Sequence, residues 1–263
     1  MPTLVWDKVG DRVFENGVDH GVLYPNGGVG VAWNGIISVA EKPTGGDLSE
    51  TYIDGDKARG SLGTENFAAT LEAFTYPDEF ALCDGTADLG KGLYVDSQPR
   101  IGFGLSYRTK IGNDVDGQDF AYKLHIVYNA LASPSEKAYA TMDDSPDAVS
   151  LSWDITTTPV LVQNRRASAH FIIDSRETDI YLLAALEEQL YGTGASQPTL
   201  PTANQLMTLF DQWQTLKVVD HGDGTWTASG PDPVVHFLDD TSFEISWHSA
   251  NPNPDGSYTL SSG

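Results

Sequence analysis

The feature that most constrains this fold is a long alternation of apolar and polar side chains around the sequence GNDVDGQD, residues 112–119. In both flanking runs, large apolar residues occupy alternate positions. The two apolar sets are Ile101, Phe103, Leu105, Tyr107 and Ile111, and then Phe120, Tyr122, Leu124, Ile126 and Tyr128. A period of two is typical of a β-strand with one buried face and one wet face. The sequence therefore predicts a hairpin from strands 100–111 and 119–131. Strands this long exceed the usual five or six residues, so we expect the hairpin to extend beyond the core of one subunit.

The rest of the chain indicates a mainly β protein with few helices. Clusters of Gly, Pro, Asn and Asp separate the further strands, which are expected at 12–24, 30–41, 48–54, 66–76, 149–157 and 168–174. Helices are expected at 77–85, 178–192 and 202–213. The second is expected to be capped by Thr178 and ended by Gly192, and the third has a Thr-x-x-Gln capping box.

The helices also mark the expected domain division. The first domain is predicted to cover residues 1–200, including the hairpin 100–131 and the helix 178–191. A linker, GTGASQPTLP, follows that helix. A C-terminal helix and β-hairpin extension is predicted over residues 201–263, as a small β appendage.

The formal net charge of −22 argues against binding of the nucleic-acid backbone, which needs clustered Lys and Arg. Solubility explains such a charge, and so does a surface that must not retain a passing polyanion. No apolar run approaches the length of a membrane span. The N-terminal sequence MPTLVWDK does not resemble a secretion signal, and the single Cys83 cannot form an internal disulfide. These features favour synthesis in a reducing cytoplasm.

The acidic loop between the two long strands invites comparison with a calcium site. An EF-hand loop needs acids at positions 1, 3 and 5, Gly at 6 and Glu at 12. With Gly117 at position 6, Gly112 falls at position 1 and Lys123 at position 12, so both ends fail. We expect a solvated hairpin tip, and the same for the acidic loops around Asp54 and Asp56 and around Asp223.

No other motif predicts catalysis, a metal or a cofactor. FGLSYRT has Arg108 where a nucleophile elbow needs its second Gly. Six scattered histidines form no HExxH motif, and GGVGVAW leads into a strand rather than into a phosphate-binding helix. Paired carboxylates for glycoside hydrolysis are not excluded by spacing. Trp153 alternates with Val149, Leu151 and Ile155, which favours core packing over a sugar-binding face.

Four stretches carry a resemblance to a known family. They are ATLEAFTYPDEFALCDG (68–85), FGLSYRTKIGND (103–114), YKLHIVYNALASPSEKAYATMDDSPDA (122–148) and SWDITTTPV (152–160). In their order and spacing the chain resembles the major tail protein, or tail tube protein, of long-tailed non-contractile bacteriophages. Within that family it is most similar to proteins of actinobacterial phages. The likeness covers residues 10 to 175 well and the C-terminal part less distinctively.

The resemblance implies a fold, an assembly and a set of partners. The fold is a tail-tube β-sandwich/barrel with flanking α-helices. The subunits form hexameric rings that stack into a tube, with the tape measure protein, the tail terminator and baseplate or tip proteins as partners. Genome DNA passes through without specific binding, and no membrane is involved. The protein would be in the virion tail after assembly in the host bacterial cytoplasm. The family has no catalytic residues, so the chain is not expected to be an enzyme.

The hairpin supplies the candidate lumen or inter-ring contacts, which are Arg108, Lys110, Asp114, Asp116, Asp119, Lys123 and His125. Four of these are potentially basic and lie on the predicted polar face. We expect acids such as Glu41, Glu72 or Asp154 to offset them, or alternatively acidic loops of the adjacent ring. Two other functions stay open: an acidic β-sandwich adhesin or carbohydrate-binding module, and an acidic glycoside hydrolase.

Overall fold

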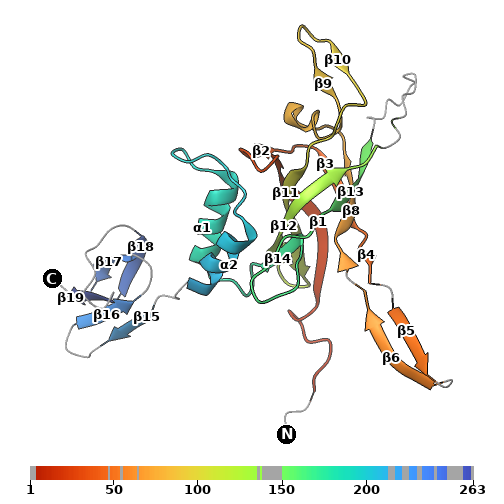
Figure 1. Cartoon of the computed structure of the whole chain (residues 1–263). Coiled ribbons are helices and arrows are strands. Elements are labelled where there is room, and N and C mark those ends of the chain that lie inside the picture. The colour runs from red at the N-terminus through yellow and green to blue at the C-terminus, as the bar shows by residue number, and fades with distance from the viewer. Residues whose placement is uncertain are drawn as a thin grey trace. The chain divides into compact units, whose positions relative to one another are not determined.

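The structure is a computed structural model, shown in Figure 1. It describes residues 4–46, 48–53, 56–63, 65–134, 137, 150–212, 217–220, 225–229, 233–239, 242–247 and 257–261. The chain divides into two compact units, Met1–Asn204 and Gln205–Gly263. The mainly β fold class is confirmed, with two α-helices among the described residues. No helix in that part of the chain is long and apolar enough to cross a membrane.

Unit 1 is organised by one eight-stranded antiparallel sheet. Its strands follow in the order β2 (Val31–Ala32), β1 (Val13–Pro25), β11 (Phe103–Asn113), β12 (Gly117–Ala132), β13 (Leu151–Thr157), β8 (Ala68–Ala73) and β3 (Ile36–Glu41), and β14 (His170–Asp174) pairs with β12 beside this path. The predicted strands 12–24, 100–111 and 119–131 are therefore confirmed as the long strands at the centre of the sheet.

The sheet curls but does not close. Its two end strands, β2 and β3, are not hydrogen-bonded to each other among the described residues. Only Trp33, Asn34 and Gly35 separate them along the chain, so the two ends of the sheet must lie near each other on that side. Gly35 has φ 81°, which suits a tight turn. The described residues of a single subunit therefore form no closed barrel.

Bulges supply the curvature. In β12, Asn129 has φ 48°, and the pairing with β11 shifts between Val127 and Ala130. Before this bulge β12 pairs with β14, and after it with β13. Bulges at Gly17 and His20 bend β1 in the same way. The bulge at Asn129 therefore lets one strand belong to two parts of the sheet that fold over a common core.

The core lies on the concave side of this curled sheet. Trp153 is fully buried and packs edge-on against Phe80 and Tyr76, with ring centroids 5.1 and 5.6 Å away. The buried cluster is Leu23, Trp33, Leu71, Ala73, Phe80, Cys83, Phe103, Leu105, Tyr107, Val127, Ala130, Ala132, Trp153 and Ile155. The predicted core role of Trp153 is confirmed, although its predicted neighbour Val149 lies outside the described residues.

The opposite face of the long strands is covered by α1 (Ile180–Tyr191) and the segment that follows it. The Tyr24 hydroxyl donates to the Leu190 carbonyl at 2.7 Å, and the Tyr128 hydroxyl donates to the Pro201 carbonyl at 2.8 Å. The helix ends at Gly192 as predicted, with φ 76°. Its N-cap is Asp179 rather than Thr178, because the Asp179 carboxylate accepts the Leu182 N–H.

The remaining elements of unit 1 are short. They are η1 (Asp78–Phe80) and the hairpins β4 (Thr44–Gly45) with β7 (Glu65–Asn66), β5 (Leu48–Ile53) with β6 (Asp56–Leu62), and β9 (Ala87–Asp88) with β10 (Tyr94–Val95). The helix predicted at 77–85 is only this 3-10 turn, since so few residues before a Gly cannot repay the cost of helix nucleation. The predicted loop around Asp54 and Asp56 is the β5–β6 connection, and Asp54 lies outside the described residues.

Unit 2 holds the C-terminal part of α2 (Ala203–Gln212) and two small sheets. One sheet has the order β15 (Lys217–Asp220), β16 (Thr225–Ser229) and β19 (Ser257–Ser261), and the other pairs β17 (Pro233–Asp239) with β18 (Ser242–Trp247). The short C-terminal hairpins expected after residue 216 are present. The predicted acidic loop at Asp223 lies outside the described residues.

Candidate functional site

The register of the central hairpin overturns the prediction of one apolar face and one polar face. Leu105 lies opposite Val127, and Arg108 lies opposite Leu124. Directly opposite residues share a face, so odd-numbered residues of β11 lie with odd-numbered residues of β12 over this stretch. The two predicted apolar sets are odd in β11 and even in β12. They therefore lie on opposite faces, one against the core and one against α1.

The same register divides the four predicted basic residues. Arg108 and Lys110 lie on the side that faces α1, whereas Lys123 and His125 lie on the side of the core residue Tyr107. Most of the hairpin beyond its tip is covered on both faces, and Ser106 and His125 are among its buried polar residues. The four residues do not form a single wet basic surface.

Arg108 joins three elements of the fold. Its Nε donates to an Asp19 carboxylate oxygen at 3.0 Å, and its Nη1 lies 3.4 Å from Glu187 Oε1 on α1. The guanidinium carbon is 4.5 Å from the centroid of the Tyr122 ring, whose hydroxyl donates to the same Glu187 oxygen at 2.8 Å. Burial lowers the pKa of Arg108, but the hydrogen bond and charge of Asp19 outweigh it and leave that pKa raised. Arg108 is thus a packed clamp between β1, the hairpin and α1.

The two lysines also have acidic partners in the same chain. Lys110 Nζ lies 3.6 Å from Asp119 and 4.0 Å from Asp19. Lys123 Nζ donates to Glu15 Oε2 at 2.6 Å. Burial raises the pKa of Glu15, but hydrogen bonds from Lys123 and then a Thr hydroxyl outweigh it and leave that pKa below its ordinary value.

The acids expected to offset these cations have other roles. Glu72 accepts a hydrogen bond from Ser38, and Asp154 accepts one from Thr70. Glu41 accepts the Tyr107 hydroxyl and lies near His125. The predicted offset by these acids is therefore wrong for Arg108, Lys110 and Lys123. Their partners come from β1, α1 and the hairpin itself, because those elements are the direct neighbours of the basic side chains.

The acidic tip is a compact turn held by its own side chains. The Asn113 side-chain oxygen accepts the N–H groups of Val115 and Asp116, and the Asn113 amide donates to Asp116. Asp114 accepts the Gly10 N–H at 2.8 Å and lies 3.7 Å from Arg12. Asp119 is largely exposed. The predicted turn is present, and each of its three acids contacts a group of the same chain, Asp119 through its ion pair with Lys110.

A second polar cluster, which the sequence did not predict, surrounds Asp84. This carboxylate is 7% exposed. It accepts a hydrogen bond from Trp153 Nε1 at 3.0 Å and forms ion pairs with Arg100 at 3.3 Å and Lys137 at 2.7 Å. These bonds connect the segment after η1 to β13. Asp84 is thus a buried charge whose partners neutralise it, and its role is structural.

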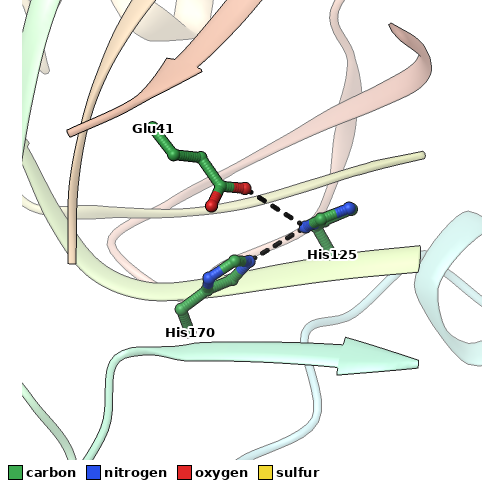
Figure 2. Close-up of side chains that lie close together, drawn as sticks. All are labelled: Glu41, His125 and His170. Carbon is green, nitrogen blue, oxygen red and sulfur yellow. Dashed lines mark hydrogen bonds and ion pairs between the residues drawn. The ribbon is translucent and has the colours of Figure 1, made fainter. Parts of the chain in front are cut away.

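A third cluster brings together Glu41 of β3, His125 of β12 and His170 of β14 (Figure 2). His125 Nδ1 lies 3.0 Å from His170 Nε2 and 3.5 Å from Glu41 Oε1. His125 is buried and stacks on Tyr107 at a centroid distance of 4.6 Å. Burial lowers the pKa of both histidines to about 4. Of the predicted candidate residues only His125 belongs to this cluster.

The hydrogen bonds define the tautomer of His125. The Thr109 hydroxyl donates its only proton to Glu15 Oε1 at 2.6 Å. Its oxygen must therefore accept at 3.0 Å from His125 Nε2, which carries the ring proton. His125 Nδ1 then holds a lone pair directed between His170 and Glu41. In neutral His170, Nε2 is accordingly the donor to His125.

Comparison with known proteins does not assign a family. No protein-family model matches the sequence, and no curated protein matches it. Among solved structures, a chain from the cryo-EM structure of the anti-feeding prophage (AFP) baseplate, 6-fold symmetrised, is 10% identical, with a TM-score of 0.32. The match covers 65% of this chain and 97% of that chain. A TM-score this low establishes no shared fold, and no property of that baseplate transfers to this chain.

Proposed function

We propose that the chain is a structural subunit of a bacteriophage tail tube, which polymerises as stacked hexameric rings and conducts DNA into a bacterial host. The proposal includes the tape measure protein, the terminator and the baseplate or tip proteins as partners, and it includes no catalytic activity. Its starting point is the resemblance of four sequence stretches to tail tube proteins. The support from the structure is a set of strand edges with which no described strand pairs.

These uncovered edges are the observation that carries the proposal. Among the described residues, β3 pairs only with β8, β14 pairs only with β12, and the first half of β1 pairs only with β11. Each edge has exposed large apolar side chains, which are Val13 and Phe14 on β1, Ile37 on β3 and Ile172 on β14. An open edge with apolar residues is a template for another strand, and neighbours in a closed ring would cover it.

The charge distribution supports the same function. Arg108, Lys110 and Lys123 are each paired with carboxylates of their own chain. Such pairing leaves these three cations little capacity for DNA phosphates, while the formal net charge is −22. An assembly with this excess of acid repels a passing polyanion, so DNA would move through a tube without being retained.

The test is electron microscopy of the purified full chain, concentrated from micromolar to millimolar, with and without its tape measure protein. We expect rings with six subunits and stacked tubes. Two edge variants, Ile37→Lys and Ile172→Lys, should remain folded by circular dichroism but lose rings and tubes, since Lys blocks edge pairing. Leu161→Lys is the matched control, because Leu161 is 85% exposed and lies outside the named strands.

Two outcomes would contradict the proposal. The first is a wild-type chain that stays monomeric under every condition, including with the tape measure protein. The second is assembly that survives both edge substitutions unchanged, which would show that the uncovered edges do not form the contacts between subunits.

A further inference from the structure

We propose that Glu41, His125 and His170 bind one divalent transition-metal ion of the zinc type, which ties β3, β12 and β14 together. This inference does not depend on tube assembly. The three residues come from distant parts of the sequence, and the fold brings one ligand atom from each to within 4.8 Å of the others (Figure 2). Two imidazoles and one carboxylate are a donor set that suits zinc, cobalt, nickel or iron better than magnesium or calcium.

The distances match a tetrahedral site. Zinc–nitrogen and zinc–oxygen bonds of about 2.0–2.1 Å place two ligand atoms of a tetrahedron roughly 3.3 Å apart. His125 Nδ1 lies 3.0 Å from His170 Nε2 and 3.5 Å from Glu41 Oε1. The Glu41 and His170 ligand atoms lie within 4.8 Å of each other, so only a small shift of the exposed Glu41 carboxylate is needed to bring all three atoms to tetrahedral spacing. In the proposed site these three atoms would form one face of the tetrahedron, and water would complete the coordination.

The hydrogen bonds prepare His125 as a ligand. Its Nε2 proton is committed to Thr109, which in turn donates to Glu15. Its Nδ1 lone pair therefore points toward His170 and Glu41, where no proton of its own can interfere. Metal-binding imidazoles are oriented by a hydrogen bond from the ring nitrogen that does not bind the metal. Here that nitrogen is His125 Nε2, and its partner is the Thr109 hydroxyl, which is held by the Glu15 carboxylate. On binding, the His170 proton moves from Nε2 to Nδ1, and the charge of that ring does not change.

The surroundings restrict water but leave an entry path. His125 stacks on Tyr107, and the His170 ring lies 4.2 Å from the Phe67 ring. The Tyr107 hydroxyl donates to Glu41 Oε1 at 3.0 Å and fixes the carboxylate beside the two rings. His125 is 3% exposed, whereas Glu41 is at the surface. A metal can thus enter past Glu41 and reach two nitrogens that the core holds in place.

The test uses the full chain, treated with a chelator and then titrated with Zn²⁺ alone or Co²⁺ alone. We expect one tight equivalent per chain, a visible Co²⁺ spectrum of a tetrahedral site, and a higher melting temperature with Zn²⁺. Glu41→Gln and His170→Gln should each weaken binding by at least about tenfold, and Thr109→Val by about tenfold. Glu41 is exposed, so its variant should fold even if a change at His170 does not.

Matched controls separate this site from weak binding elsewhere on an acidic surface. Glu72→Gln changes an acid of the neighbouring strand, and His20→Asn changes an exposed histidine at a position of positive φ that Asn tolerates. Both should bind Zn²⁺ as the wild type does. The inference is overturned if the wild type takes up no tight equivalent, or if Glu41→Gln and His170→Gln bind Zn²⁺ as tightly as the two controls.

Discussion

Replacement of Arg108 by Met should destabilise unit 1 strongly, because Arg108 is a packed clamp rather than a free surface cation. The side chain is 17% exposed and lies against Asp19 of β1, Glu187 of α1 and the Tyr122 ring. Met retains most of the apolar stem but removes the charge. The variant leaves two partly buried carboxylates without their common partner, so the expected effect is a lower free energy of unfolding.

The structure sets the size of this effect. At an effective dielectric constant of about 20, unit charges 3.0 Å apart, as for Arg108 and Asp19, attract by roughly 5.5 kcal/mol. Desolvation of the charged groups cancels much of this gain. Breaking a fully buried pair costs about 3–5 kcal/mol, and the acids here are still 29% and 23% exposed. We therefore expect Arg108→Met to lower the unfolding free energy by about 2–3 kcal/mol.

The assay is amide hydrogen exchange of peptides from β11 and β12 across a urea series, which reports on unit 1 without contributions from unit 2. Arg176→Met is the control, since Arg176 pairs with Asp174 at 2.6 Å but is 35% exposed. That surface pair should contribute less than about 1 kcal/mol. A double-mutant cycle with Asp19→Asn should give a coupling energy of about 1–2 kcal/mol. If Arg108→Met costs no more than the control, Arg108 is not a clamp.

Two further results are expected from the same clamp and from the bulge in β12. Burial raises the pKa of Asp19, but the hydrogen bond and charge of Arg108 outweigh it and leave that pKa below its ordinary value of 3.8. The folded chain thus binds fewer protons than the unfolded chain in acid. The stability that this pKa difference contributes is present at neutral pH and is lost as the pH falls through 3.8 toward the folded pKa. In a plot of unfolding free energy, measured with urea, against pH, Asp19→Asn should therefore flatten the acidic part of the curve. Asn129→Val should lower the free energy of unfolding by about 1–3 kcal/mol in a thermal unfolding experiment, because it forces a β-branched residue to positive φ. Asn129→Gly should lower it less, since Gly adopts positive φ without strain. Equal losses in the two variants would contradict the role of the bulge.

The sequence predicts the strands well because their signals are local. Each strand expected before residue 178 overlaps a strand of the structure, although the single strand expected at 30–41 is divided into β2 and β3. The long hairpin follows directly from its alternation and its turn residues. The faces of the hairpin are not a local property. They depend on the register with the partner strand, which the turn at Asn113 and the bulge at Asn129 set. A sheet that is covered on both faces also carries apolar residues on both, so alternation alone gives the wrong expectation.

The polar clusters could not be predicted from the sequence, because the residues of each cluster lie far apart along the chain and meet only through the fold. His125 was predicted as a hairpin residue, but Glu41 and His170 reach it only because β12 changes partner at Asn129 and the sheet curls. The same holds for Arg108, whose partner Glu187 lies on a helix far along the chain. Scattered histidines and acids give no spacing signal in such a case.

The placement of charge bears on how copies of this chain would associate. The hairpin cations face carboxylates of their own chain, so contacts between copies gain little from them. The formal charge of −22 is repeated in each copy, and like charges in one ring repel one another. Attraction must then come from uncovered strand edges and the apolar side chains on them, such as Ile37 and Ile172. Salt screens the repulsion between the acidic copies but leaves the apolar attraction in place. The proposed tube would therefore be held together by strand pairing and apolar contacts. Its acidic charge would serve mainly to prevent DNA from adhering along its path.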